Sequence, residues 1–183
     1  AGFGAGYGTV AEAMQDPALA RLVERQMKAA AATLPDLPGI DLDGYRADLV
    51  ARFSNPAIRH LTYQIAMDGT QKLPPRIFAA LGKGADSAPF AFAVASWMHY
   101  CLGQRADGSR YNLRDPREDE IASRLSSVGQ TAEAVFDALA TLPGFMPSGI
   151  RTDLRSTVLP HLTIMLTQGT KAAIQSAADG MRP

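Results

Sequence analysis

The sequence contains few residues of several types, and each shortage excludes a class of protein. Cys101 is the single cysteine, so the chain cannot form an internal disulfide, a cysteine-based zinc site or a Cys-x-x-Cys redox pair. Its mostly apolar neighbours predict a buried, unreactive thiol. Lys and Arg (18) balance Asp and Glu (18), so neither nucleic acid nor a membrane surface is expected as a partner. The composition is that of one globular domain in a reducing, cytoplasmic compartment.

Long hydrophobic runs and secretion signals are also missing. The most apolar segment, residues 89–102, has 14 residues, fewer than the roughly 20 that a membrane span needs. It predicts a central buried helix. The N-terminal residues lack the positive start and apolar run of a signal peptide. A helix bundle bound to a membrane surface would need a basic amphipathic face, and the sequence shows none.

Helix signals recur along the chain and predict an all-α fold. Thr9 and Glu12 form a capping box. Asp16, Asn55 and Asp115 each precede a proline, which pairs an N-cap acceptor with a first helical residue that needs no donor. No segment alternates with the period of two that a strand requires. We predict about eight to ten helices, which after the one capped by Thr9 cover residues 17–34, 42–53, 56–68, 74–81, 89–103, 116–127, 130–142, 150–168 and 170–178.

Glycine and proline predict where these helices end. Gly69 is placed to close the helix over residues 56–68 as a left-handed C-terminal residue. Pro160 should kink or split the helix over residues 150–168. Residues 103–115 are charged, contain Asp107-Gly108 and predict the longest loop.

Common catalytic and metal-binding motifs are absent. The glycines of residues 2–8 are spaced by two, which does not match a dinucleotide-binding loop, and predict a flexible end. His60, His99 and His161 lie far apart, so no metal site is expected, and His99 is interpreted as a hydrogen-bonded core histidine. The acidic residues 118–120 suit the first turn of a helix.

Residues 55–76, NPAIRHLTYQIAMDGTQKLPPR, contain the strongest candidate for a binding residue. The helix after Asn55 is expected to stop at Asp68-Gly69, and a short link then precedes the helix that Pro74 opens. Lysine is scarce, and Lys72 is one of only four among 18 basic residues. On a link braced by two helices its ammonium could be fixed for a ligand oxygen. From the pattern alone, a solvated loop lysine is the simpler interpretation.

Three segments carry a resemblance to a known family. They are AGYGTVAEAM at residues 5–14, ARFSNPAIRH at residues 51–60 and QIAMDGTQKLPPR at residues 64–76. They resemble the long-chain mannitol dehydrogenases, polyol-specific enzymes that include mannitol 2-dehydrogenases and fructuronate reductases, also called mannonate oxidoreductases. The resemblance implies that residues 1–183 are the all-α C-terminal substrate-binding domain, which is similar to the C-terminal domain of 6-phosphogluconate dehydrogenase.

The family resemblance also implies what this chain leaves out. An N-terminal Rossmann-type domain binds NAD in that family, and we expect it to be absent here. The catalytic signature, a Lys followed five positions later by Asn and three further on by His, precedes the matching segments, and no lysine here is followed by it. The implied reaction is a metal-independent hydride transfer with that Lys as general base. We expect no catalytic, cofactor-binding or metal-binding residue within residues 1–183, and no activity of the isolated chain.

Substrate binding is the role that remains. The family's lysine in the Asp-Gly-Ser/Thr-Gln-Lys motif contacts hydroxyls of an open-chain sugar, and it matches Lys72. Mannitol-specific members carry an Arg eight residues earlier, where this sequence has Gln64, and the surrounding residues resemble the hexuronate-reducing branch. The resemblance thus implies Lys72 and Gln64 as substrate-binding residues. A mannitol-type polyol and fructuronate are equal alternatives as substrate.

The expected function follows from these observations. We expect the C-terminal domain of a cytoplasmic NAD-dependent oxidoreductase that interconverts a sugar alcohol and a ketose. Its partners would be a polyol or hexuronate and its own Rossmann domain. An apolar patch near residues 1–10 and 64–76 would face that domain, and a dimer through this patch would be an artefact of truncation. The alternative of another class is a non-catalytic helical module that binds a partner protein.

Overall fold

The computed structural model describes residues 1–35 and 38–180, which fold into helices joined by turns and loops. The helical segments are, in order, α1 (Val10–Met14), α2 (Pro17–Ala31), α3 (Leu42–Phe53), α4 (Thr62–Ala66), α5 (Gly69–Leu73), the π-helix η1 (Pro74–Phe78), α6 (Ala79–Leu81), α7 (Ala88–Tyr100), α8 (Glu118–Ser126), α9 (Ala132–Ala140), α10 (Ser148–Gln168) and α11 (Thr170–Asp179). These described residues contain two isolated β-bridges and no strand. The all-α prediction is confirmed. With the contiguous segment α5–η1–α6 counted once, the number of helices falls within the predicted range.

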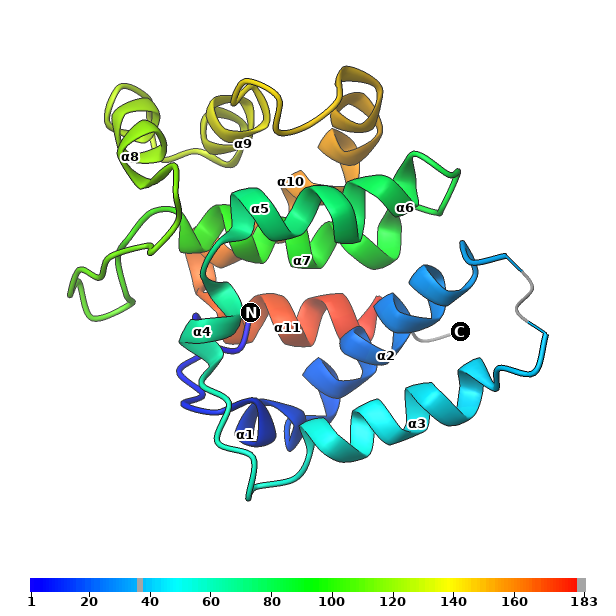
Figure 1. The fold of residues 1–183 in the computed structure, drawn as a ribbon. Coiled ribbons are helices and arrows are strands. Elements are labelled where there is room, and N and C mark those ends of the chain that lie inside the picture. The colour runs from blue at the N-terminus through cyan, green and yellow to red at the C-terminus, as the bar shows by residue number, and fades with distance from the viewer. Residues whose placement is uncertain (36–37, 181–183) are drawn as a thin grey trace.

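The core is built around α7, as the apolar segment predicted. Phe90, Val94 and Met98 are fully buried, α10 packs along α7, and α2 and α9 also contact it. In Figure 1, α7 runs through the middle of the molecule, with α8 and α9 on one side and α2 and α11 on the other. α10 continues through Pro160 and is not split there. Pro160 lies on the exposed side of α10, where water can bond the carbonyl that loses its N–H partner.

α1, α2, α3 and α11 form a second layer (Figure 1). α2 packs against α11, and α3 contacts α1 and α2 but buries none of its residues. The glycine-rich segment before α1 is ordered, contrary to the predicted flexible end. Its Ala5 is buried and donates its N–H to the Ala1 carbonyl at 2.9 Å. A Cβ on Gly4 would lie 2.7 Å from Thr170 Oγ1, so this segment packs closely on α11.

Two of the predicted helix starts are confirmed in detail. Thr9 and Glu12 form both halves of the capping box at α1. Asp16 caps α2 by accepting the amides of Ala18 and Leu19, and Pro17 is the first helical residue. These caps use only neighbours in sequence, which is why the sequence alone could predict them.

The helix predicted directly after Asn55 is wrong. Asn55 Oδ1 accepts the amide of Ala57 at 2.9 Å, but the next helix, α4, starts only at Thr62. The chain in between runs beside the N-terminal segment, where the Thr62 N–H donates to the Gly8 carbonyl at 3.0 Å. This pairing across the chain holds the backbone extended and overrides the local helix signal.

The helix predicted over residues 74–81 exists, but it starts earlier and changes geometry. Helical structure begins at Gly69 and passes through the π-helix η1 before α6. Pro74 and Pro75 lack N–H groups, so two regular helical hydrogen bonds cannot form. The Ala79 N–H donates instead to the Pro74 carbonyl, five residues back, which is the π-helical pattern.

Candidate functional site

The segment that carries the predicted lysine begins with a left-handed residue. Asp68 has φ 55° and precedes α5, whereas Gly69 is helical and lacks a positive φ. The prediction that Gly69 ends a helix in the left-handed conformation is therefore wrong. A glycine is required here because a Cβ would lie 1.8 Å from Nε1 of the buried Trp97. α5 thus packs with its backbone directly against the indole ring on α7.

Lys72 lies on α5 rather than on the predicted link between helices. Its Nζ donates to the main-chain carbonyl of Gln64 at 3.2 Å and lies 3.7 Å from Asp68 Oδ2. The Lys72 side chain is 28% exposed, so it is partly packed against the protein and partly open to solvent. An ammonium has three donors, and these contacts within the described structure engage two at most. The charge is held in place yet can still donate to a ligand.

Gln64 lies next to Lys72, but the contact runs through its backbone. The side chain of Gln64 is exposed, and its Oε1 accepts the amide of Leu61 at 3.4 Å at the start of α4. The structure therefore places the two predicted substrate-binding residues side by side. The Gln64 amide group itself points toward the N-terminus of α4 and does not contact the ammonium.

Asp115 is a residue of this site that the sequence interpretation missed. It was predicted to cap a helix at Pro116, but α8 begins only at Glu118. The buried carboxylate of Asp115 accepts the Thr70 amide at 2.9 Å and the Thr70 hydroxyl at 2.5 Å, and it also accepts the amide of Arg117 at 3.0 Å. Because Thr70 and Asp115 are 45 positions apart, no local pattern could have found this contact.

A second link joins the same two segments. The Asp68 N–H donates to the carbonyl of Arg114 at 3.3 Å. Asp68 and Arg114 are the only non-glycine residues with positive φ in the described ranges, at 55° and 50°. Left-handed backbone in such residues costs on the order of 1 kcal/mol each and often marks functional sites. Both strained residues are at this junction, directly beside the Thr70–Asp115 contact.

An aromatic cluster holds the long loop between α7 and α8 against α4. Phe3, Tyr63, Tyr100 and Tyr111 form it, with ring centroids 4.9–6.4 Å apart. The Tyr100 hydroxyl donates to the Leu113 carbonyl at 2.6 Å, next to the site residues of this loop. Burial raises the pKa of Tyr100 and of Tyr111, so both hydroxyls stay protonated donors. The cluster therefore fixes the loop that supplies Asp115.

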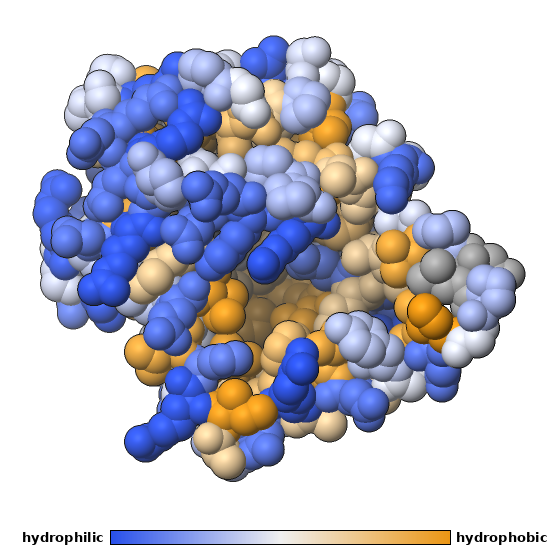
Figure 2. All heavy atoms as spheres, in the orientation of Figure 1, coloured by the Kyte–Doolittle hydropathy of each residue, from blue (hydrophilic) through white to orange (hydrophobic). Residues whose placement is uncertain are grey.

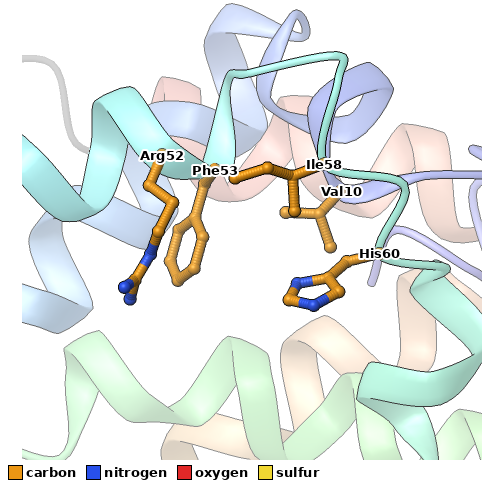
Figure 3. A pocket seen from close by; sticks show the side chains of 5 residues that line it. All are labelled: Val10, Arg52, Phe53, Ile58 and His60. Carbon is orange, nitrogen blue, oxygen red and sulfur yellow. The ribbon is translucent and has the colours of Figure 1, made fainter.

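A shallow pocket of about 300 Å³ lies close to α4. Figure 3 shows its lining: Val10 from α1, Arg52 and Phe53 from the end of α3, and Ile58 and His60 from the extended segment. In Figure 2 the face that carries α3, α4 and α5 is hollowed, with an apolar floor and hydrophilic residues above it. On the surface of this region, Leu61 is 45% and Ile65 60% exposed. The face around Lys72 thus combines a fixed cation with exposed apolar side chains.

The remaining chemically reactive residues belong to the packed body. Cys101 is buried, and burial raises the pKa of its thiol well above the usual range. Burial lowers the pKa of His99 and of His161. No hydrogen bond joins the His99 ring to any described residue, contrary to its interpretation as a hydrogen-bonded core histidine, whereas His161 meets the ring of Phe92 edge-on at 5.6 Å.

Residues 1–35 and 38–180 contain neither a metal-binding cluster nor a membrane-spanning helix. No group of three His, Cys, Asp or Glu residues there could hold a metal ion. No helix in these ranges is both long and apolar enough to cross a bilayer. The residues before α1 pack on α4 and α11, through Gly2 beside Thr62 and Gly4 beside Thr170. The candidate site is therefore the Lys72 region.

The fold and this site define the chain as an all-α domain in which one lysine is held by contacts with two neighbouring residues. The family model of the mannitol dehydrogenase C-terminal domain matches residues 1–146, which include Gln64, Lys72 and Asp115. The chain belongs to this family. The resemblance that the sequence motifs indicated is confirmed.

Relatives and a solved structure support the assignment. D-mannonate oxidoreductase of Escherichia coli (strain K12) is 37% identical over 148 residues, 78% of this chain and 30% of that protein. Mannitol 2-dehydrogenase of Aspergillus oryzae is 29% identical over 182 residues, 97% of this chain and 34% of that protein. The structure of Pseudomonas fluorescens mannitol 2-dehydrogenase in ternary complex with NAD and D-mannitol matches 97% of this chain with a TM-score of 0.86 at 24% identity, so the fold is shared. The chain spans about a third of the length of these proteins.

Proposed function

We propose that this chain is the substrate-binding C-terminal domain of an NAD-dependent oxidoreductase that interconverts a sugar alcohol and a ketose of the mannitol/fructose type. The observation that carries the proposal is the position of Lys72. Its ammonium is held by the Gln64 carbonyl and the Asp68 carboxylate, in the part of the chain that matches this family. The similarity to mannitol 2-dehydrogenases and to D-mannonate oxidoreductase supports the reaction class.

The role of Lys72 in this proposal is to orient the substrate. An ammonium can donate hydrogen bonds to hydroxyls of an open-chain polyol, and its fixed position would hold the reacting carbinol in register. NAD, bound by an N-terminal Rossmann domain, supplies the hydride acceptor. The general base and the residues that stabilise the oxyanion would come from outside residues 1–183, on the N-terminal side. The described residues of this chain contribute positioning rather than proton transfer.

A hexuronate is the second candidate substrate, and Gln64 favours it. The relative named D-mannonate oxidoreductase is 37% identical over the matched residues. A carboxylate on the substrate would gain a charge-assisted hydrogen bond from Lys72, which is worth more than a neutral one. The polyol and the hexuronate hypotheses therefore both assign substrate binding to Lys72. They differ in whether its ammonium contacts a hydroxyl or a carboxylate.

Steady-state kinetics of the full-length protein with Lys72→Ala tests this function. KM and kcat are measured with NAD and mannitol, and separately with mannonate. A lost hydrogen bond from a charged group is worth about 1.5–3 kcal/mol, so we expect KM to rise by roughly 10- to 150-fold for the true substrate. Lys83→Ala, at an exposed lysine beyond α6, is the matched control and should leave KM unchanged. An unchanged KM for both substrates in Lys72→Ala would refute the proposed role.

A further inference from the structure

We propose that Asp115 is a positioning residue: its buried carboxylate holds α5 in place and thereby fixes the Lys72 ammonium for the substrate. This inference rests on the proposed function. Asp115 does not contact Lys72, and it acts through Thr70, two residues before Lys72 on the same short helix. The juxtaposition brings together two segments that are 45 residues apart in the sequence.

The geometry of the contact restrains both position and rotation. Asp115 Oδ2 accepts the Thr70 amide at 2.9 Å, and Oδ1 accepts the Thr70 hydroxyl at 2.5 Å. Both residues are buried, with 8% and 9% of their surface exposed. Two hydrogen bonds from one residue to the two oxygens of one carboxylate leave α5 little freedom to turn. Hydrogen bonds to an ionised acceptor are also stronger than neutral ones.

α5 needs this external support because it cannot cap itself. It spans only Gly69–Leu73, and no side chain caps it at Asp68. The Thr70 N–H is one of the first helical amides, which have no partner inside their own helix. Asp115 therefore takes the part of an N-cap residue that the local sequence does not supply. The Asp68–Arg114 backbone contact adds a second restraint beside it.

The Asp115 carboxylate is itself anchored, so the restraint reaches the body of the protein. Its Oδ1 also accepts the amide of Arg117, and Glu118 accepts the amides of Leu113 and Arg114 at 2.7 and 3.1 Å. The loop is thus tied to the start of α8. A shift of α5 would separate Lys72 from the Gln64 carbonyl and move its charge away from the substrate.

The first test compares local opening of α5 in full-length variants by hydrogen exchange. Asp115→Asn keeps the size of the side chain but replaces one acceptor oxygen with a donor group. We expect faster exchange of the amides of residues 69–73, by tenfold or more. Asp107→Asn is the matched control, because Asp107 lies on the same loop but its carboxylate accepts from Ser109, within that loop, and not from α5. Equal exchange in wild type and Asp115→Asn would overturn the inference without reference to any substrate.

The second test asks whether Asp115 acts through Lys72. We expect Asp115→Asn to raise KM by about ten- to a hundredfold, because a displacement near 1 Å can cost that much. In a Lys72→Ala background the same substitution should add little. An equal factor in both backgrounds, or an unchanged KM in Asp115→Asn, would contradict a positioning role. If Lys72→Ala alone changes nothing, the proposed function fails instead.

Variants at Thr70 keep the proposal testable if Asp115→Asn does not fold. Thr70→Val replaces the hydroxyl with a methyl group and keeps the hydrogen bond from the backbone N–H of residue 70 to Asp115. We expect it to raise KM, and Thr70→Ser, which restores the hydroxyl, to return KM close to the wild-type value. A KM that is the same for Thr70→Val and Thr70→Ser would overturn the role of this contact.

Discussion

Replacement of Gly69 by alanine separates helix propensity from packing, because the two predict opposite signs. Gly69 is the first residue of α5 and has no positive φ, so alanine would be expected to stabilise the helix by about 0.5–1 kcal/mol. A Cβ there would lie 1.8, 2.2 and 2.7 Å from Nε1, Cδ1 and Cε2 of Trp97. No packed interior tolerates such distances without movement.

The size of the effect depends on whether Trp97 can move. Its ring is buried and packs against Phe145 with centroids 4.8 Å apart, and Phe145 in turn meets Phe78 edge-on at 5.2 Å. Forced repacking of a filled core costs about 1–3 kcal/mol or more, and three overlapping ring atoms place this site at the upper end. We expect a net loss of about 2–3 kcal/mol. For a domain of this size that lowers Tm by about 4–12 °C.

Urea and thermal unfolding of the chain, followed by circular dichroism, measure this effect. Gly149→Ala is the matched control, since Gly149 is also helical and a Cβ there meets nothing within 4 Å. It should be neutral or slightly stabilising. In a Trp97→Phe background, which removes Nε1, Gly69→Ala should cost less than in the wild type. A Gly69→Ala protein as stable as the wild type would refute the packing argument.

Two further predictions concern reactive side chains of the body. Cys101 should resist alkylation by iodoacetamide at pH 8 in the folded chain and react only after unfolding, because its thiol is buried with a raised pKa; rapid labelling under native conditions, detected by mass spectrometry, would contradict this. Because burial lowers the pKa of His99 and His161, the unfolded chain binds protons more readily than the folded one, so stability should fall as pH drops below 6.5. His161→Gln should flatten that loss of stability between pH 7.5 and 5.5, and equal slopes in wild type and His161→Gln would contradict this prediction.

The sequence predicts those parts of the fold in which a residue and its partner are close along the chain. The capping box of Thr9 and Glu12 and the Asp16 cap need only a turn of helix, and α3 begins and ends where its pattern indicates. The same reasoning fails at Asn55 and Asp115. Both have the right side chain beside a proline, but the segment after Asn55 pairs its backbone with the N-terminal segment. The Asp115 carboxylate accepts the nearby Arg117 amide and is shared with Thr70, 45 residues away, while the helix starts only at Glu118.

In the candidate site, too, contacts between residues close in sequence could be predicted and contacts between distant segments could not. Lys72 and Gln64 are eight residues apart, and a motif that spans both could indicate that they lie together. What holds Lys72 in place could not be predicted in this way. Trp97 approaches from the central helix and Asp115 from a long loop, and neither contact leaves a local trace in composition or spacing. The motif thus indicates which residue to propose for substrate binding, and the tertiary structure explains how that residue is held.

The order of the residues in the Asp-Gly-Thr segment follows from these contacts. Gly69 must lack a side chain because Trp97 occupies the space. The glycine of this segment is therefore needed at position 69, and another residue must adopt the left-handed conformation at position 68. That turn falls to Asp68, since Asp tolerates positive φ better than most residues and its carboxylate also lies near Lys72. Thr70 then supplies both donors to Asp115. A chain with residues 68 and 69 exchanged would keep its composition and a local turn signal, yet its side chain at position 69 would collide with the indole and α5 could not form where the site needs it.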